Sequence, residues 1–131
     1  VAAFMEKCKV DAKSKGYAET VFGRRRYLPE LTSSNANLRN FGERVAMNMP
    51  LQGTAADIIK IAMIKVWERL KKEVPEAHLI MQVHDELIIE APESKHEEVA
   101  LLLKQEMENA VTMSVPFCAD VNCGKTWYDA K

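Results

Sequence analysis

The chain has 131 residues, enough for one domain, with 47% apolar residues, 28% charged residues and a formal net charge of -1. This composition excludes an intrinsically disordered chain, which combines low hydrophobicity with a large net charge. No apolar stretch reaches the ~20 residues that span a bilayer. The three cysteines are odd in number and widely spread, so they predict no disulfide framework and favour a reducing, cytoplasmic setting.

The charges are unevenly distributed along the chain. Residues 1–72 carry 14 basic and 7 acidic side chains, whereas residues 73–131 carry 4 basic and 12 acidic ones. This polarity is typical of a protein that offers one face to phosphates while another face holds cations or stays solvated. Chance clustering on solvated faces produces the same pattern.

The N-terminal part predicts a helix followed by a hairpin. Apolar residues recur at helical spacing over residues 1–15, and Gly16 marks the end of this helix. Short β-type runs over residues 17–21 and 25–28 flank a Phe-Gly-Arg turn, which indicates two antiparallel strands.

A long kinked helix is predicted next. Three candidate N-caps, Ser33, Ser34 and Asn35, precede a helix over residues 36–49, and Pro50 should kink any helix that continues through it. The helix beyond the kink ends before Pro75. One wide apolar face follows it, at steps of three and four residues: Ala55, Ile58, Ile59, Ala62, Val66, Trp67 and Leu70.

The C-terminal part predicts a second hairpin, a helix and a strand. Apolar runs over residues 79–83 and 87–89 are separated only by His-Asp-Glu, which favours a tight turn. A capping-box spacing at Ser94–Glu97 opens a helix that ends near residue 111. Alternation over residues 117–123 predicts a half-buried strand. The fold class is therefore α+β, with a small antiparallel sheet packed against a long kinked helix and further helices.

The sharpest candidate for chemistry is the turn that contains Asp85 and Glu86, preceded by His84. A tight turn between two apolar strands is a rigid support for acidic groups that must hold a hard cation. Adjacent carboxylates oppose each other's ionisation, which a divalent metal relieves. Mg²⁺ is usually held by one or two carboxylates together with substrate phosphates. An ordinary polar hairpin turn is the alternative, because Asp is common in turns.

A second candidate is a polar stripe formed by Arg44, Asn48 and Gln52, each four residues from the next. Such residues lie on nearly the same helix face, with a drift of about 40° at each step. Their donors suit the minor groove of duplex DNA, where purine N3 and pyrimidine O2 accept hydrogen bonds with little sequence information. A solvated helix face is the alternative.

The only basic triplet, Arg24, Arg25 and Arg26, lies on the first predicted hairpin. Contact with DNA phosphates is the functional interpretation. A charged hairpin edge that discourages aggregation is an equally good explanation.

Together these segments resemble the C-terminal end of the bacterial family A DNA polymerases. Three blocks carry the resemblance in order and spacing: GYAET with FGRRRYLP at residues 16–29, ERVAMNMPLQGTAAD at residues 43–57, and QVHDEL at residues 82–87. The tail, with Gly124 and Trp127, is also similar. The likeness covers nearly the whole chain.

The resemblance implies roles for the candidate residues. Asp85 would be one of two aspartates that ligate two Mg²⁺ ions, with Glu86 as an accessory acid and His84 at the primer strand. The stripe of Arg44, Asn48 and Gln52 would follow the primer–template minor groove. The partners would be primer–template duplex DNA and a deoxynucleoside triphosphate, in DNA replication and repair.

Two elements of the family pattern are missing from the sequence: the Asp-Tyr-Ser motif with the other metal-binding aspartate, and the nucleotide-binding fingers helix. The chain also begins at Val1 rather than Met. We therefore expect the last part of a longer polymerase, with residues 1–34 between fingers and palm and residues 35–131 in the later half of the palm. By itself it should be inactive, and surface normally covered by the missing N-terminal part could drive self-association.

Two other functions compete with this interpretation. A non-catalytic module could bind duplex DNA on a palm scaffold, with an affinity that depends steeply on salt. A small metal-dependent nuclease could use Asp85 and Glu86, although no other acidic block has nuclease spacing.

Overall fold

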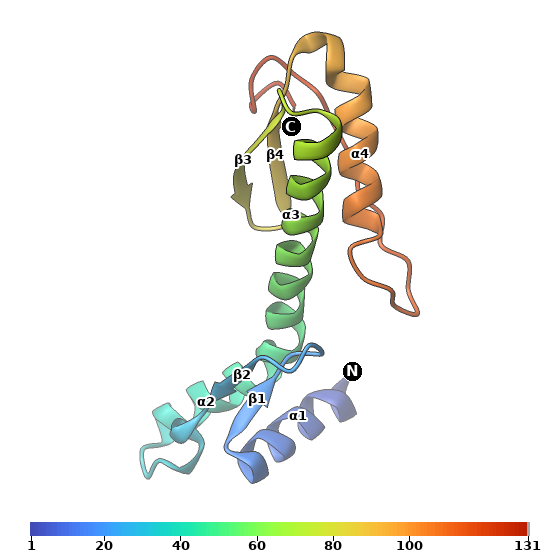
Figure 1. Ribbon diagram of the computed structural model, residues 1–131. Coiled ribbons are helices and arrows are strands. Elements are labelled where there is room, and N and C mark those ends of the chain that lie inside the picture. The colour runs from blue at the N-terminus through green and yellow to red at the C-terminus, as the bar shows by residue number, and fades with distance from the viewer. Residues whose placement is uncertain (131) are drawn as a thin grey trace. The chain divides into compact units, whose positions relative to one another are not determined.

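The computed structural model describes residues 1–130 and has an α+β fold, as predicted. The described residues form four α-helices, two β-hairpins and short helical turns, whose course Figure 1 shows. In chain order the elements are α1 (Ala2–Lys15), β1 (Tyr17–Glu19), β2 (Arg25–Tyr27), a 3-10 turn (Pro29–Thr32), α2 (Ala36–Asn48), a π turn (Met49–Gly53), α3 (Thr54–Glu73), β3 (His78–Val83), β4 (Glu86–Glu90), a 3-10 turn (Glu93–Lys95) and α4 (His96–Glu108).

The chain forms two compact units. The first contains Val1–Asp57, and the second begins at Ile58 and continues through the rest of the described residues. Helix α3 begins in the first unit and continues in the second.

The first unit confirms the predicted helix and hairpin. Gly16 ends α1 in the left-handed conformation, with φ 79°, which a residue without a Cβ adopts at little cost. Strands β1 and β2 then pair antiparallel, with Tyr17 opposite Tyr27. Their rings meet edge to face, with centroids 5.8 Å apart. The small core of the unit contains five buried apolar residues: Ala12, Ala18, Leu28, Leu31 and Ala46.

The predicted cap and the predicted disturbance at Pro50 are both present. The Asn35 side chain caps α2 by accepting a hydrogen bond from the Asn37 backbone N–H at 2.9 Å. Pro50 lies in the π turn that joins α2 to α3. Because Pro50 has no N–H, it cannot continue the α-helical ladder, and the wider turn accommodates the missing bond.

Helix α3 supplies the central apolar face of the second unit. In Figure 1, α3 lies between α4 and the β3–β4 hairpin. Ala62, Val66 and Leu70 of α3 are buried in one hydrophobic core together with Leu87 of β4 and Leu102 of α4. The prediction was wrong for two members of the apolar face, because Ala55 and Trp67 are exposed. Trp67 is 53% exposed, and its ring lies under the Lys71 ammonium.

Polar contacts join α3 to α4 beside this core. The Lys65 ammonium donates to the carbonyl oxygens of Asn109 and Ala110, at 2.8 and 3.0 Å. These carbonyls follow the last turn of α4, so Lys65 supplies the positive charge that a helix C-terminus favours. The Arg69 guanidinium bridges Glu73 of α3 and Glu106 of α4, and these two hydrogen bonds raise the pKa of Arg69.

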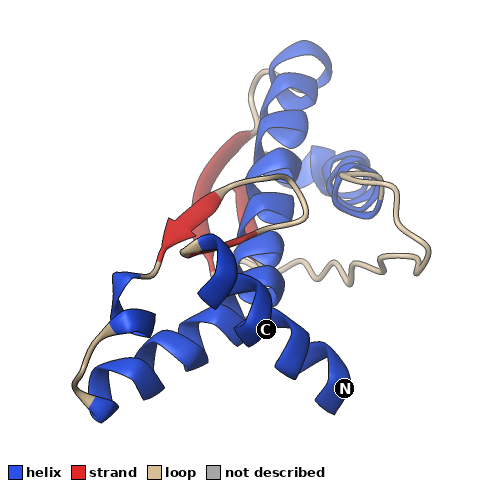
Figure 2. Cartoon of the chain, turned by 90° about the horizontal axis from the view of Figure 1, so that it is seen from below, coloured by secondary structure: helices blue, strands red, loops and turns tan. Residues whose placement is uncertain are grey.

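Three sequence predictions about the C-terminal part were wrong. Ser94 does not cap α4, because Glu93–Lys95 form a 3-10 turn and the helix begins at His96 without a side-chain cap. The helix ends at Glu108, before the predicted residue 111. No strand is assigned over residues 117–123, which follow α4 as loop (Figure 2). This segment pairs with no described strand, and Ala119 N instead donates to the Glu108 carboxylate at 3.1 Å.

No helix among residues 1–130 combines the length and the apolar character that a membrane crossing requires.

Two adjacent leucines of α4 test how far packing stabilises the second unit. Leu102 is 2% exposed within the core, whereas Leu101 is 58% exposed. Leu102→Ala should lower the free energy of unfolding by about 2–5 kcal/mol, because it removes buried methyl groups and leaves a cavity. Leu101→Ala should change it by less than about 0.5 kcal/mol. Urea unfolding measures both, and equal losses would contradict the assignment of the core.

Candidate functional site

The His-Asp-Glu turn is the tight connection that the sequence predicts. Val83 pairs with Glu86, so His84 and Asp85 are the two loop residues of the β3–β4 hairpin. His84 has φ 53°, and it is the only described residue other than glycine with a positive φ. Primed two-residue turns require a positive φ at their first central position, usually from Gly or Asn. The hairpin therefore holds His84 in a conformation that a histidine adopts at some cost.

The carboxylates of Asp85 and Glu86 are exposed next to this turn. Within residues 1–130 neither carboxylate has a hydrogen bond or an ion pair. Their oxygens are the ligands that Mg²⁺ prefers, so the donor set fits a hard cation. No group of three or more His, Cys, Asp or Glu side chains in the described part of the chain could hold a metal by itself. Any metal at Asp85 thus requires further ligands.

The polar stripe lies on α2 and the π turn. Arg44 and Asn48 belong to α2, and Gln52 belongs to the π turn. All three side chains are exposed, and none has a hydrogen bond or ion pair within the described residues. In an α-helix four residues turn about 40° more than a full circle. A π turn closes with i→i+5 bonds and therefore has more residues per turn than an α-helix. The step of four residues from Asn48 to Gln52 thus rotates less than the step from Arg44 to Asn48, and this offsets the drift.

The three arginines of the hairpin have different surroundings. Arg24 donates to the Asp57 carboxylate at 2.7 Å and to the Gly53 carbonyl at 2.9 Å. Arg25 lies over the Tyr17 ring at 4.5 Å, and its hydrogen bond to Glu19 raises the pKa of Arg25.

Arg26 is exposed and makes no polar contact with a described residue. The pairing of Arg24 with Asp57 joins residues 33 positions apart, which no local spacing in the sequence reveals.

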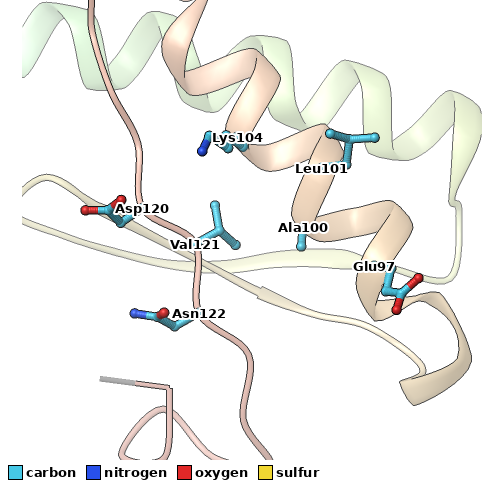
Figure 3. Close-up of a pocket in the computed structure, with 7 residues that line it drawn as sticks. All are labelled: Glu97, Ala100, Leu101, Lys104, Asp120, Val121 and Asn122. Atoms are coloured by element: carbon cyan, nitrogen blue, oxygen red, sulfur yellow. The ribbon is translucent and has the colours of Figure 1, made fainter.

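The candidate residues fall into two groups. His84, Asp85 and Glu86 belong to the second unit, and the polar stripe with the arginine triplet belongs to the first. A shallow groove of the second unit contains none of them. Glu97, Leu101 and Lys104 of α4 line this groove, and the loop after α4 contributes Asp120 and Asn122 (Figure 3).

Residues 1–129 match the sequence model of a protein family that is described as DNA polymerase family A. The chain belongs to DNA polymerase family A. Its relatives include DNA polymerase I of Bacillus caldotenax, which is 54% identical over all 131 residues, and that of Bacillus subtilis, which is 52% identical over the same length. The thermostable DNA polymerase I of Thermus filiformis is 49% identical. The chain spans about 15% of the length of these relatives.

A solved structure has the same fold over nearly the whole chain. It is described as the POL domain of Pol1 from M. smegmatis in complex with DNA primer-template and dNTP. The TM-score is 0.92 at 44% sequence identity, over 96% of this chain and 22% of that chain.

The strained turn makes a prediction about stability. His84→Val should lower the free energy of unfolding by about 1–3 kcal/mol, because a β-branched residue resists a positive φ. His84→Asn should change it by less than about 0.5 kcal/mol, since Asn tolerates this conformation. The same two substitutions at exposed His78 of β3 provide the control, because Val favours a strand. Thermal unfolding measures all four variants, and a stable His84→Val protein would contradict the strain.

Proposed function

We propose that the chain is a C-terminal part of a DNA-directed DNA polymerase that acts in replication and repair. One observation carries the proposal: a family A chain presents Asp85 and Glu86, without internal partners, at the tight turn of a hairpin. The reaction would be template-directed transfer of deoxynucleotides by two-metal phosphoryl transfer. Residues 1–34 would lie between fingers and palm, and residues 35–131 would form the later half of the palm.

In this proposal Asp85 supplies carboxylate oxygens to divalent cations, and Mg²⁺ suits their hardness. When bound, two such ions stabilise the attacking and leaving oxygens of an in-line displacement. Glu86 adds negative charge beside Asp85, and His84 contacts the primer strand. The short hairpin loop holds all three backbones rigidly, which is what positioning of a reacting phosphate demands.

The polar stripe would hold the primer–template duplex. Arg44, Asn48 and Gln52 present donors along one side of α2 and the π turn, and minor-groove acceptors occur at every base pair. Such contacts grip duplex DNA without selecting its sequence. Arg26, which is exposed, is the member of the triplet that is available to a phosphate, while Arg25 remains a second candidate.

Other segments of the same polymerase would complete the site. The missing Asp-Tyr-Ser motif would supply further metal ligands, and a fingers helix would bind the incoming nucleotide. We propose the cytoplasm as the setting of the reaction.

Replacement of Asp85 tests the catalytic assignment. In the gene product that contains this sequence, Asp85→Asn should lower the rate of primer extension by about a thousandfold or more. An amide cannot replace the charge of a metal ligand, and such charge stabilisation is worth several kcal/mol. Asn also suits a turn, so the fold should be retained. Single-turnover incorporation of one nucleotide measures the rate.

Asp120→Asn is the matched control, because Asp120 is an exposed aspartate on the loop after α4. It should extend primers at the wild-type rate, and both variants should bind duplex DNA equally well. Primer extension by Asp85→Asn at the wild-type rate would contradict the proposal.

A polypeptide limited to these 131 residues should not extend primers, because the Asp-Tyr-Ser motif and the nucleotide-binding fingers helix are not among its residues. Primer extension by the purified chain in Mg²⁺ would overturn this expectation. Duplex affinity that falls steeply with salt, in a gene product that never extends primers, would favour the non-catalytic binding module.

A further inference from the structure

The tip of the β1–β2 hairpin is hydrogen-bonded to the end of the π turn and to the first turn of α3. The Arg24 guanidinium donates through Nε to Asp57 and through a terminal nitrogen to the Gly53 carbonyl. The Val21 backbone N–H donates to the Thr54 hydroxyl at 3.1 Å. All these residues belong to the first unit, and we refer to the contacts that they make as the hairpin clamp.

Close packing supports the hairpin clamp. A Cβ at Gly53 would lie 2.8 Å from the Thr20 methyl and 3.0 Å from the Met49 sulfur. The hairpin therefore rests directly on the backbone of the π turn. The Thr54 hydroxyl also donates to the Pro50 carbonyl at 2.5 Å, across the turn itself.

Pro50 cannot donate a backbone hydrogen bond near the beginning of the π turn, so contacts from outside the helix add to the support of this turn. The Gly53 carbonyl, which Arg24 binds, directly follows Gln52. The Thr54 side chain, which binds Val21, comes one residue later. The orientation of the Gln52 backbone is thus fixed from its C-terminal side by the hairpin.

We propose that Arg24 and Thr54 are positioning residues that hold Gln52 in line with Asn48 and Arg44 for minor-groove contact. This inference rests on the proposed function of the polar stripe. It also changes the role of Arg24, which the sequence suggested as a phosphate contact. Arg24 acts through its planar fork, which joins two acceptors at once, and a lysine offers the same charge without that fork. Thr54 is 7% exposed, so it acts through the turn and not on DNA.

The test uses the gene product that contains this chain and measures incorporation of one nucleotide. The primer ends either in ordinary guanines or in 3-deazaguanines, which lack the N3 acceptor of the minor groove. The wild-type protein should be about 3- to 13-fold slower on the 3-deaza primer, which lies within the range for loss of one hydrogen bond. Arg24→Lys and Thr54→Val should be slower on the ordinary primer and should discriminate the two primers by less than about twofold.

Arg39→Lys is the matched control. Arg39 also joins two acceptors, the carbonyls of Ser33 and Ser34, but at the beginning of α2. It should discriminate the two primers as the wild-type protein does. Because discrimination is a ratio measured within one protein, a general loss of folded protein does not alter it. Thr54→Val remains informative if Arg24→Lys fails to fold.

The outcomes separate the inference from the proposed function. Wild-type discrimination by Arg24→Lys and Thr54→Val would overturn the positioning role and leave the minor-groove contact intact. Equal rates of the wild-type protein on both primers would overturn the minor-groove contact and the inference together. A further variant, Arg24→Ala, separates charge from geometry. If Arg24→Lys incorporated the nucleotide at the wild-type rate and only Arg24→Ala were slower, Arg24 would act through its charge and not through its planar fork.

Discussion

The missing N–H of Pro50 is the constraint on which the first unit depends. It prevents α2 and α3 from forming one continuous α-helix and places a π turn between them. The wider turn changes the angle at which successive side chains leave the helix. At the far end of this turn, the Arg24 guanidinium between β1 and β2 donates to the Gly53 carbonyl. The junction of the two helices is thus held by a residue 29 positions earlier in the chain.

In the second unit, the main requirement is that an exposed acidic turn be held rigidly. Its strands are short, and β3 has no buried residue. The support comes from one side, where Leu87 of β4 packs into the core built by α3 and α4. Lys65 and Arg69 then fix α4 against α3 by polar contacts. The apolar residues of α3 therefore stabilise the hairpin from which Asp85 extends.

The sequence predicted most elements, because their signals are local. Gly16 ends a helix, Asn35 caps one, and three polar residues between apolar runs form a tight turn. The failures involve competition between signals or partners distant in sequence. A 3-10 turn displaced the capping box at Ser94, and the alternating segment over residues 117–123 forms no strand because alternation specifies a face but not a pairing partner. Within the candidate site, the pairing of Arg24 with Asp57 could not be predicted either, because the two residues are 33 positions apart. The Asp85 turn and the spacing of the polar stripe were predicted directly.

Because Gly53 lies against Thr20, the substitutions that one of these positions tolerates depend on the residue at the other. Any side chain at position 53 collides with the Thr20 methyl, so most single changes there are expected to be rejected. Serine at position 20 removes that methyl and keeps the hydroxyl that accepts from the Arg24 N–H. An alanine at position 53 should therefore be tolerated more readily after Thr20→Ser than before it. Thr20→Ser must therefore come first if the protein is to remain folded at each step toward the double variant.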